Sequence, residues 1–286
     1  MGSVAMELEV EGSGLDSDGR TFSSTQEMWE EETGGEDKKE EWYKKGVGYW
    51  ENVEASVDGV LGGYGHVHQK DMQGSSAFLA SLLPKMRGEG AHLVALDCGA
   101  GVGRVTEHLL LNHFHEVDLV EPVSHFLESA HEKLKGGKHS KSEAHRAVNF
   151  YCIPLQEFTP EAGRYDVIWI QWCIGHLTDA DLVEFFNRAK AGLKPGGFFV
   201  LKENVARNGF VLDKEDHSVT RSDAYFRKLF SQAGLHLNQM KAQKGFPQEL
   251  FPVKMYALTL EAPVIVQDVL QNKRPKRKIN KPSIIR

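Results

Sequence analysis

The sequence predicts an α/β protein built on a doubly wound, mostly parallel sheet. Residues 93–96 and 165–170 are apolar runs of the kind found in strands that are buried on both faces. The first run leads directly into three alternating glycines, Gly99, Gly101 and Gly103. A buried strand, a glycine-rich turn and a following helix form the nucleotide-binding unit of this fold class.

The remaining elements follow in chain order. Thr178 or Asp179 can cap a helix that runs to about Leu193, and the Pro-Gly-Gly sequence at residues 195–197 is expected to end it. Ligand-binding groups in such a sheet gather at the carboxyl ends of the strands. We expect the strands at residues 93–96, 116–121, 149–155, 165–170 and 198–201.

Asp97, at the end of the first strand, indicates which ligand this turn binds. A dinucleotide pyrophosphate is negatively charged and binds helix-terminal N–H groups, so a carboxylate beside it is unfavourable. A sulfonium ligand is cationic and can use that carboxylate. The acid together with the glycines therefore favours S-adenosylmethionine over NAD. Glu121 ends the second strand roughly 20 residues beyond the glycine turn, where a carboxylate can accept hydrogen bonds from ribose hydroxyls.

Composition limits the other possibilities. The 286 residues are 41% hydrophobic, which is enough for one large core, and no apolar run is long enough to span a bilayer. We therefore expect no membrane partner. Cys98, Cys152 and Cys173 lie in or beside predicted strands, so we expect reduced, buried thiols. They have no metal-ligand spacing with the 13 histidines, so no metal site is expected. No extended heptad repeat demands a partner subunit, and a monomer is expected.

Charge is concentrated at the two ends of the chain. Residues 1–41 hold 13 acids and three bases, and this acidic, Gly/Ser-rich segment is expected to be disordered. A single domain then spans residues 42–262, followed by a basic tail at residues 263–286. Within that tail, residues 273–278 read Lys-Arg-Pro-Lys-Arg-Lys and resemble a nuclear import signal, which predicts a location in nucleus and cytoplasm. A solvated tail and a loose nucleic-acid contact are the alternatives.

Two longer stretches carry a specific resemblance. Residues 57–66 read Val-Asp-Gly-Val-Leu-Gly-Gly-Tyr-Gly-His, and residues 169–179 read Trp-Ile-Gln-Trp-Cys-Ile-Gly-His-Leu-Thr-Asp. Together they closely resemble the α-N-terminal protein methyltransferases, which methylate the free amino terminus of Xaa-Pro-Lys proteins after the initiator methionine is removed. The resemblance extends from about residue 42 to residue 258. It implies the Rossmann-like class I methyltransferase fold, with an antiparallel edge strand, and protein substrates with exposed Xaa-Pro-Lys termini.

The resemblance also implies a site for S-adenosylmethionine, whose product is S-adenosylhomocysteine. Arg104 can bind the methionyl carboxylate, although an ordinary surface salt bridge is the alternative for this residue. The family often has Asp where this chain has Glu121, and the longer side chain can make the same bond. The residues expected in the cofactor site are Asp97, Gly99, Gly101, Arg104, Glu121, Pro122, Val123, Leu155, Gln156 and Gln171.

On the acceptor side, the attacking amine must be neutral. An α-amine has a pKa of about 7.7–8.0, so a modest base is sufficient, and Asp216 or His176 could serve. Asn204 can orient the amine, while Asp213 and Ser218 can bind a lysine at the third position. An apolar pocket for proline is expected from Trp172, Leu61, Val67 and Leu250.

Each acceptor residue also has an ordinary alternative. Asp213 and Asp216 could be solvated loop acids, His176 a capping or core residue, and Trp172 a core residue. At Phe251 the family commonly has a tyrosine whose hydroxyl contacts the peptide, and its absence removes a bond worth about 0.5–1.5 kcal/mol. Two other functions remain open: methylation of a small-molecule amine, and a non-enzymatic scaffold whose basic tail binds nucleic acid. The slightly negative charge of the domain argues against a nucleic-acid partner.

Overall fold

The computed structural model describes residues 12–83, 91–135 and 144–262. Its centre is a seven-stranded sheet in the order β10-β11-β7-β6-β3-β4-β5. Strands β3 to β7 pair in parallel, whereas β11 pairs antiparallel with β7 and with the edge strand β10. This confirms the predicted fold class. The strands are β3 (Val94–Cys98), β4 (Glu116–Val120), β5 (Arg146–Tyr151), β6 (Tyr165–Gln171), β7 (Leu193–Asn204), β10 (His236–Ala242) and β11 (Val253–Thr259).

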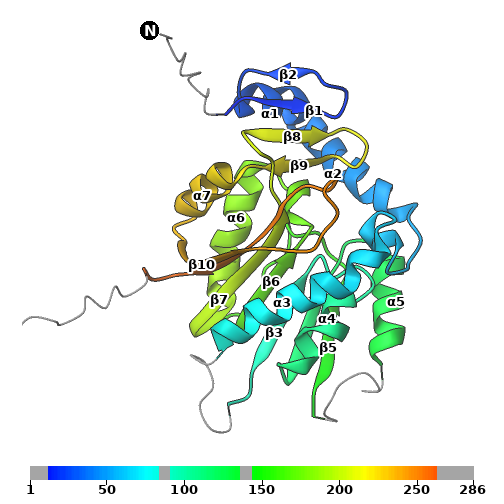
Figure 1. Cartoon of the computed structure of the whole chain (residues 1–286), viewed down its shortest axis with the longest axis vertical. Coiled ribbons are helices and arrows are strands. Elements are labelled where there is room, and N and C mark those ends of the chain that lie inside the picture. The colour runs from blue at the N-terminus through cyan, green and yellow to red at the C-terminus, as the bar shows by residue number, and fades with distance from the viewer. Residues whose placement is uncertain (1–11, 84–90, 136–143, 263–286) are drawn as a thin grey trace, which may run out of the picture.

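Helices cover both faces of this sheet (Figure 1). On β6, Val167 and Trp169 pack with α3 (His68–Leu82), α4 (Arg104–His108) and α5 (Ser124–Leu134) in one cluster. Ile168 and Ile170 pack with α6 (Asp179–Ala189) and α7 (Asp223–Gln232) in another. Successive side chains of a strand point to opposite faces, so a continuously apolar strand supplies two cores.

Three predicted boundaries differ in the structure. β5 is Arg146–Tyr151 rather than 149–155, because Pro154 has no N–H for the ladder and the chain turns there. The helix capped by Thr178 ends at Ala189 rather than near Leu193. The Pro-Gly-Gly sequence lies inside β7, where residues 194–197 interrupt the pairing with β6 between Tyr165 and Val167.

The expected disorder of residues 1–41 is wrong for residues 12–41. These residues form β1 (Gly14–Asp16), β2 (Thr21–Phe22), α1 (Thr25–Thr33) and the first part of α2 (Glu36–Glu51). β1 and β2 join β8 (Phe210–Asp213) and β9 (Ser218–Arg221) in a second sheet, in the order β2-β1-β8-β9. Phe22 and Met28 are at most 2% exposed. A few apolar side chains thus anchor a segment whose many acids lie mainly at the surface. Residues 1–11 lie outside the described ranges.

Two further predictions concern the cysteines and the basic tail. Cys98 is buried and Cys173 half-buried, but Cys152 is exposed, because it follows the last residue of the edge strand β5. The tail at residues 263–286 lies outside the described part of the chain. Across the described ranges, no helix is sufficiently long and apolar to cross a membrane. Those same ranges contain no group of His, Cys, Asp and Glu side chains placed to hold a metal ion.

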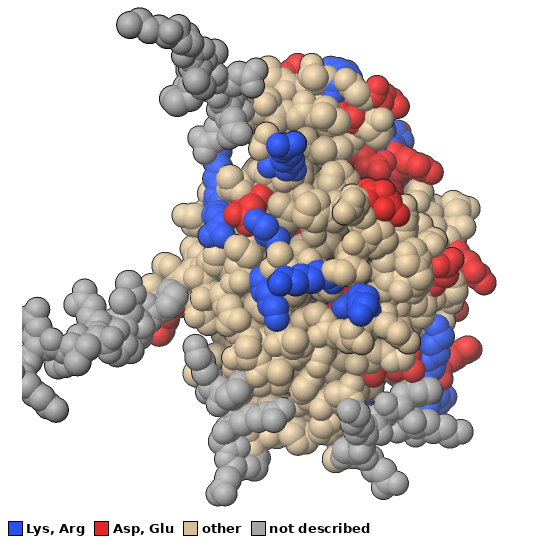
Figure 2. Space-filling view, in the orientation of Figure 1, with Lys and Arg blue, Asp and Glu red and all other residues tan. Residues whose placement is uncertain are grey.

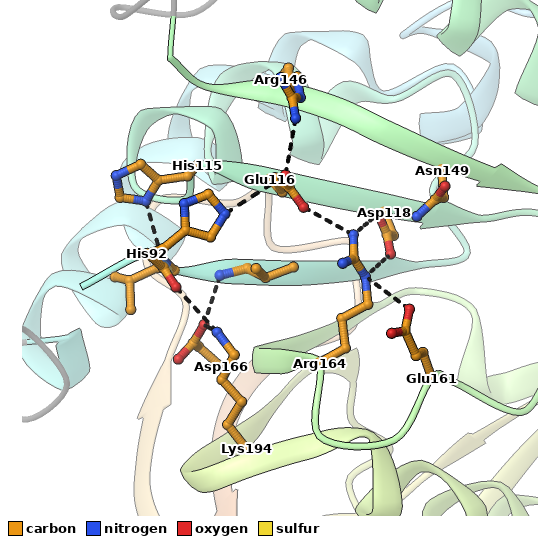
Figure 3. A network of polar contacts seen from close by, with 12 residues as sticks. His92, His115, Glu116, Asp118, Arg146, Asn149, Glu161, Arg164, Asp166 and Lys194 are labelled. Carbon is orange, nitrogen blue, oxygen red and sulfur yellow. Dashed lines mark hydrogen bonds and ion pairs between the residues drawn. The ribbon is translucent and has the colours of Figure 1, made fainter. Parts of the chain in front are cut away.

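A polar network lies near the amino ends of β4 and β6, at the opposite end of these strands from the glycine turn (Figure 3). Its centre is Asp118, a fully buried carboxylate on β4. Arg164 donates to both of its oxygens, from Nε at 2.7 Å and from Nη2 at 3.0 Å. The Tyr165 hydroxyl donates a third bond at 2.9 Å. This network ties β4 to the start of β6 and has no place in the cavity described below.

Candidate active site

A partly open cavity lies at the carboxyl ends of β3, β4 and β6. Trp172 and His176 line it, as do all ten residues expected to bind the cofactor: Asp97, Gly99, Gly101, Arg104, Glu121, Pro122, Val123, Leu155, Gln156 and Gln171. The other predicted acceptor residues are not among its lining side chains: Leu61, Val67, Asn204, Asp213, Asp216, Ser218, Leu250 and Phe251.

The glycine turn has a left-handed backbone, with φ +64° at Gly99 and +53° at Gly101. A Cβ on Gly99 would lie 2.3 Å from Cβ of Cys173, which follows the neighbouring strand β6. A Cβ on Gly101 would be in ordinary contact with Val60, at 3.4 Å. Gly99 therefore allows two strand ends to approach closely, a role beyond the ligand access expected from sequence.

The Glu121 side chain links this turn to the end of β4 by hydrogen bonds. Its Oε2 accepts a hydrogen bond from the Gly101 N–H at 2.8 Å, and its Oε1 accepts one from Val123 at 2.9 Å. Burial raises the pKa of Glu121, and the two N–H donors oppose that effect. Since each carboxylate oxygen can accept more than one bond, the group retains capacity for ligand hydroxyls.

Asp97 is buried against the first turn of α4. Its Oδ2 accepts a hydrogen bond from the Thr106 hydroxyl at 2.7 Å. Burial raises the pKa of Asp97 to about 7, while Thr106 and the nearby Arg104 guanidinium favour the charged form. The group is therefore poised to ionise when a cation enters the cavity.

Arg104 is almost fully buried, so the surface salt-bridge alternative is wrong. It forms an ion pair with Asp71 on α3, and Asp71 also pairs with the fully buried Lys202 on β7. Gln171 donates to both Asp71 oxygens, at 3.0 and 2.9 Å. Two cations against one carboxylate leave a net positive charge beneath the cavity, which suits a ligand carboxylate. Sequence reasoning missed Asp71 and Lys202, because neither belongs to a motif.

Helix α2 supplies a wall of the cavity that the sequence did not predict. Tyr43, Gly46, Val47 and Trp50 recur three to four residues apart and so lie on one helix face, together with the adjacent Trp42. This helical spacing of aromatic and small residues was the available signal. Trp42 Nε1 donates a hydrogen bond to the backbone oxygen of His176 at 2.7 Å.

His176 has both ring nitrogens occupied. Trp50 Nε1 lies 3.0 Å from Nε2 of His176, and an indole N–H can only donate, so Nε2 is the acceptor. Nδ1 lies 3.1 Å from the backbone oxygen of His217 and must therefore carry the proton. In this arrangement both ring nitrogens of His176 are already engaged, so neither is free for a substrate group.

Asp216 lies in the turn between β8 and β9. Its Oδ1 is buried without a hydrogen-bond partner among the described residues, while Ser218 hydrogen-bonds to the carboxyl group. Burial raises the pKa of Asp216. A Cβ on Gly46 would lie 3.6 Å from the Asp216 backbone oxygen and 3.5 Å from Nδ1 of His176. Asp216 therefore adjoins the cavity wall at Gly46 rather than lining it.

Trp172 carries two signs of a functional role. Its backbone is left-handed, with φ +53°, which is strained for a residue with a side chain. Its indole Nε1 is buried and has no partner within the described part of the chain. The Arg104 guanidinium carbon lies 5.5 Å from the centre of the ring. An unpaired buried donor at a cavity wall fits a ligand that supplies the acceptor.

The other predicted acceptor residues are more dispersed. Asp213 accepts a hydrogen bond from the Glu215 N–H at 2.9 Å, as in an ordinary turn. Val67 is buried, while Asn204, at the end of β7, is half-buried. Phe251 is 41% exposed. Of the four residues expected to form the proline pocket, Trp172 is the member that lines this cavity.

Several known proteins are similar to this chain over most of its length. A family model described as AdoMet dependent proline di-methyltransferase matches residues 38–259. Alpha N-terminal protein methyltransferase 1 of Arabidopsis thaliana is 61% identical, over 96% of this chain and 99% of the relative. N-terminal Xaa-Pro-Lys N-methyltransferase 1-B of Xenopus laevis is 44% identical, over 76% of this chain and 95% of the relative. A Leishmania major structure described as a SAM-dependent methyltransferase superposes with a TM-score of 0.78 at 40% identity, covering 91% of this chain and 100% of that one.

Proposed function

Because this chain belongs to the AdoMet-dependent proline di-methyltransferase family, we propose that it methylates the free α-amine of proteins that begin Xaa-Pro-Lys. One observation carries the proposal. The cavity that holds every predicted cofactor residue continues to Trp172 and His176, and the backbone oxygen of Asp216 adjoins its wall at Gly46. The predicted cofactor residues and these three acceptor candidates therefore lie close together.

The residues present fit S-adenosylmethionine. Glu121 suits the ribose hydroxyls, and the positive network of Arg104 and Lys202 suits the methionyl carboxylate. The buried carboxyl group of Asp97 suits the cationic sulfonium of this cofactor. When bound, this cofactor supplies an electrophilic methyl group on a sulfonium.

Residues of this chain then deprotonate and position the amine. Asp216 accepts the ammonium proton, and its raised pKa brings it closer to that of an α-amine, at about 7.7–8.0. His176, fixed by Trp50 and by the His217 carbonyl group, holds the cavity wall beside the amine. Trp172 offers an apolar ring to the proline, whose rigid backbone loses little entropy on binding.

Acids close to the predicted acceptor site favour a basic peptide. Figure 2 shows acidic side chains gathered at the upper right of the face in view. Helix α2 itself has little net charge, because its acids are interspersed with Lys38, Lys39, Lys44 and Lys45. Asp213, Glu215 and Asp216 lie in or beside the β8–β9 turn and would attract a third-position lysine.

The test compares peptides by mass spectrometry with fragment mapping. An Xaa-Pro-Lys peptide with a free amine should gain methyl groups at that amine. The same peptide acetylated at its amine should gain none, because an amide nitrogen has no available lone pair. Arginine at the third position should be tolerated and glutamate should not, since two acids would then meet in a partly desolvated groove. Methyl groups on a lysine side chain, or on the blocked peptide, would contradict the proposal.

We also propose that residues 273–278, which lie outside the described ranges, direct entry to the nucleus. The test attaches a carrier protein too large to diffuse through nuclear pores. Replacing the five bases of the hexapeptide by alanine should shift the fusion to the cytoplasm and leave peptide methylation unchanged. An unchanged distribution would contradict this proposal.

A further inference from the structure

Residues 12–35, called here the N-terminal cap, comprise β1, β2 and α1 and precede the match to the family model, which begins at residue 38. The Arabidopsis relative aligns with 96% of this chain, whereas the Xenopus relative aligns with 76% and is itself 95% covered. Figure 1 shows the cap stacked on the β8–β9 hairpin. That hairpin carries the predicted acceptor residues Asp213, Asp216 and Ser218.

The cap extends the hairpin into a sheet. β1 pairs in parallel with β8, with Gly14 opposite Phe210 and Asp16 opposite Leu212. The Ser17 N–H donates to the Leu212 carbonyl oxygen at 2.8 Å. Two four-residue strands are marginally stable alone, and additional strands with an apolar face supply the missing stability.

Side-chain packing fixes the register of this pairing. The Phe22 and Phe210 rings lie with their centres 6.0 Å apart. β1 can approach the Phe210 ring closely because Gly14 has no side chain. A Cβ on Gly14 would lie 2.6 Å from that ring. Leu15, the next residue, is 43% exposed on the opposite side of the strand.

The cap also holds the tip of the hairpin. The Lys214 N–H donates to the Ser17 hydroxyl at 3.3 Å, and its ammonium group pairs with Asp18 at 2.8 Å. Lys214 lies in the chain between Asp213 and Asp216. The cap therefore contacts the short segment that carries both acids.

A third contact links the cap to the cavity wall. The Trp29 ring on α1 meets Trp42 on α2 edge-on, with ring centres 5.3 Å apart. Trp42 in turn donates to the His176 carbonyl oxygen. No described residue of the cap lines the cavity itself.

We propose that the N-terminal cap is a positioning element for the acceptor site, which holds the β8–β9 hairpin so that Asp213, Asp216 and Ser218 face the incoming peptide. This inference rests on the proposed function. Because the cap contacts the hairpin and α2 but not the glycine turn, loosening it should weaken peptide recognition and spare cofactor binding.

The test compares Gly14→Val with Leu15→Val in the full-length protein. The first substitution drives a side chain into Phe210, whereas the second changes a neighbouring exposed residue of the same strand. Gly14→Val should raise the KM for an Xaa-Pro-Lys peptide by about tenfold or more and leave the calorimetric Kd for S-adenosylmethionine within about twofold. Backbone amides of residues 210–221 should exchange hydrogen faster in this variant. Leu15→Val should match the wild type in all three measurements.

Phe22→Leu provides a second, milder variant, which removes the ring contact with Phe210 and should reproduce the same pattern in smaller measure. If Gly14→Val also loses cofactor binding, that substitution has disturbed more than the hairpin, and Phe22→Leu is then the variant that tests the positioning role. Faster exchange in the hairpin with an unchanged peptide KM would overturn the positioning role while leaving the proposed function intact. A wild-type protein that leaves every Xaa-Pro-Lys peptide unmethylated would instead contradict the proposed function, and this inference with it.

Discussion

Nε1 of Trp50 donates a hydrogen bond to Nε2 of His176 at 3.0 Å, across 126 residues of sequence. The other ring nitrogen of His176 faces the His217 carbonyl oxygen at 3.1 Å. One imidazole thereby joins the helix that covers the cavity, the turn after β6 and the hairpin that carries Asp216.

This relationship predicts the tautomer of His176. Long-range proton–nitrogen NMR of the wild type should show an Nδ1–H imidazole. Trp50→Phe keeps the aromatic packing and removes the donor to Nε2, while the bond from Nδ1 to the His217 carbonyl oxygen should preserve the Nδ1–H form. Turnover should fall by roughly 2- to 12-fold, the equivalent of one hydrogen bond. Trp42→Phe is the control, because it removes a bond to the backbone of His176 and leaves the ring contacts unchanged. An Nε2–H imidazole in the wild type would contradict the assignment.

Asp216→Asn should lower turnover by about 10²- to 10⁴-fold near neutral pH, the usual contribution of a general base. Above pH 8 or so the α-amine loses its proton unaided, and the defect should shrink. Cofactor affinity should stay within a few-fold. Asp213→Asn, on the same hairpin, should mainly raise the peptide KM, by a factor that does not depend on pH. If the Asp216→Asn defect were equally large at every pH, the carboxylate would be positioning the amine rather than deprotonating it.

Gly99→Ala should abolish cofactor binding, because the added Cβ collides with Cβ of Cys173 and the backbone at Gly99 is left-handed. Gly101→Ala imposes a similar backbone strain, of about 1–2 kcal/mol, without the collision and should reduce affinity far less. Adding Cys173→Gly to the Gly99→Ala variant removes the opposing Cβ and should restore part of the binding. Calorimetry on the four proteins provides the comparison. Equal losses in the two single glycine variants, with no rescue, would argue against the packing explanation.

Asp97 predicts how cofactor affinity depends on pH. Burial raises its pKa to about 7, and a cationic ligand favours the ionised form, so binding releases a proton. Affinity for S-adenosylmethionine should therefore increase from about pH 6 to about pH 8 and then level off. S-adenosylhomocysteine lacks the sulfonium charge and should show a weaker dependence. Asp97→Asn should flatten both profiles. Identical slopes for the two ligands in the wild type would show that Asp97 does not respond to the sulfonium.

Arg164→Ala should destabilise the fold by about 3–5 kcal/mol, because it leaves the buried Asp118 carboxylate without its bidentate partner. Arg146→Ala removes a largely exposed partner of Glu116 in the same network and should cost at most about 1 kcal/mol. Urea unfolding measures both values. Neither change should alter cofactor affinity in the folded protein at 25 °C. Similar stability losses for the two variants would show that burial of the Asp118–Arg164 pair does not govern its contribution.

The residues expected from the sequence to bind the cofactor all line one cavity. Asp97, Gly99 and Glu121 occupy the ends of strands whose apolar runs are visible in the chain, and parallel strands deliver their ends to one edge of a sheet. The acceptor half was predicted from a family resemblance, which supplied residues but not their contacts. It could not show that both nitrogens of His176 are occupied or that Gly99 packs against Cys173.

The sequence alone therefore determined the fold class and the position of the glycine turn with the acids Asp97 and Glu121, because strand periodicity and the glycine turn are local properties of the chain. The other expected cofactor residues came from the family resemblance. Tertiary structure decided the rest. Residues 12–41 looked disordered from their acid content, yet Phe22 and Met28 become buried against segments far along the chain. Asp71 and Lys202 form one ion pair although they are 131 positions apart. Burial and pairing between distant segments depend on where the chain places them in space, which composition and spacing do not encode.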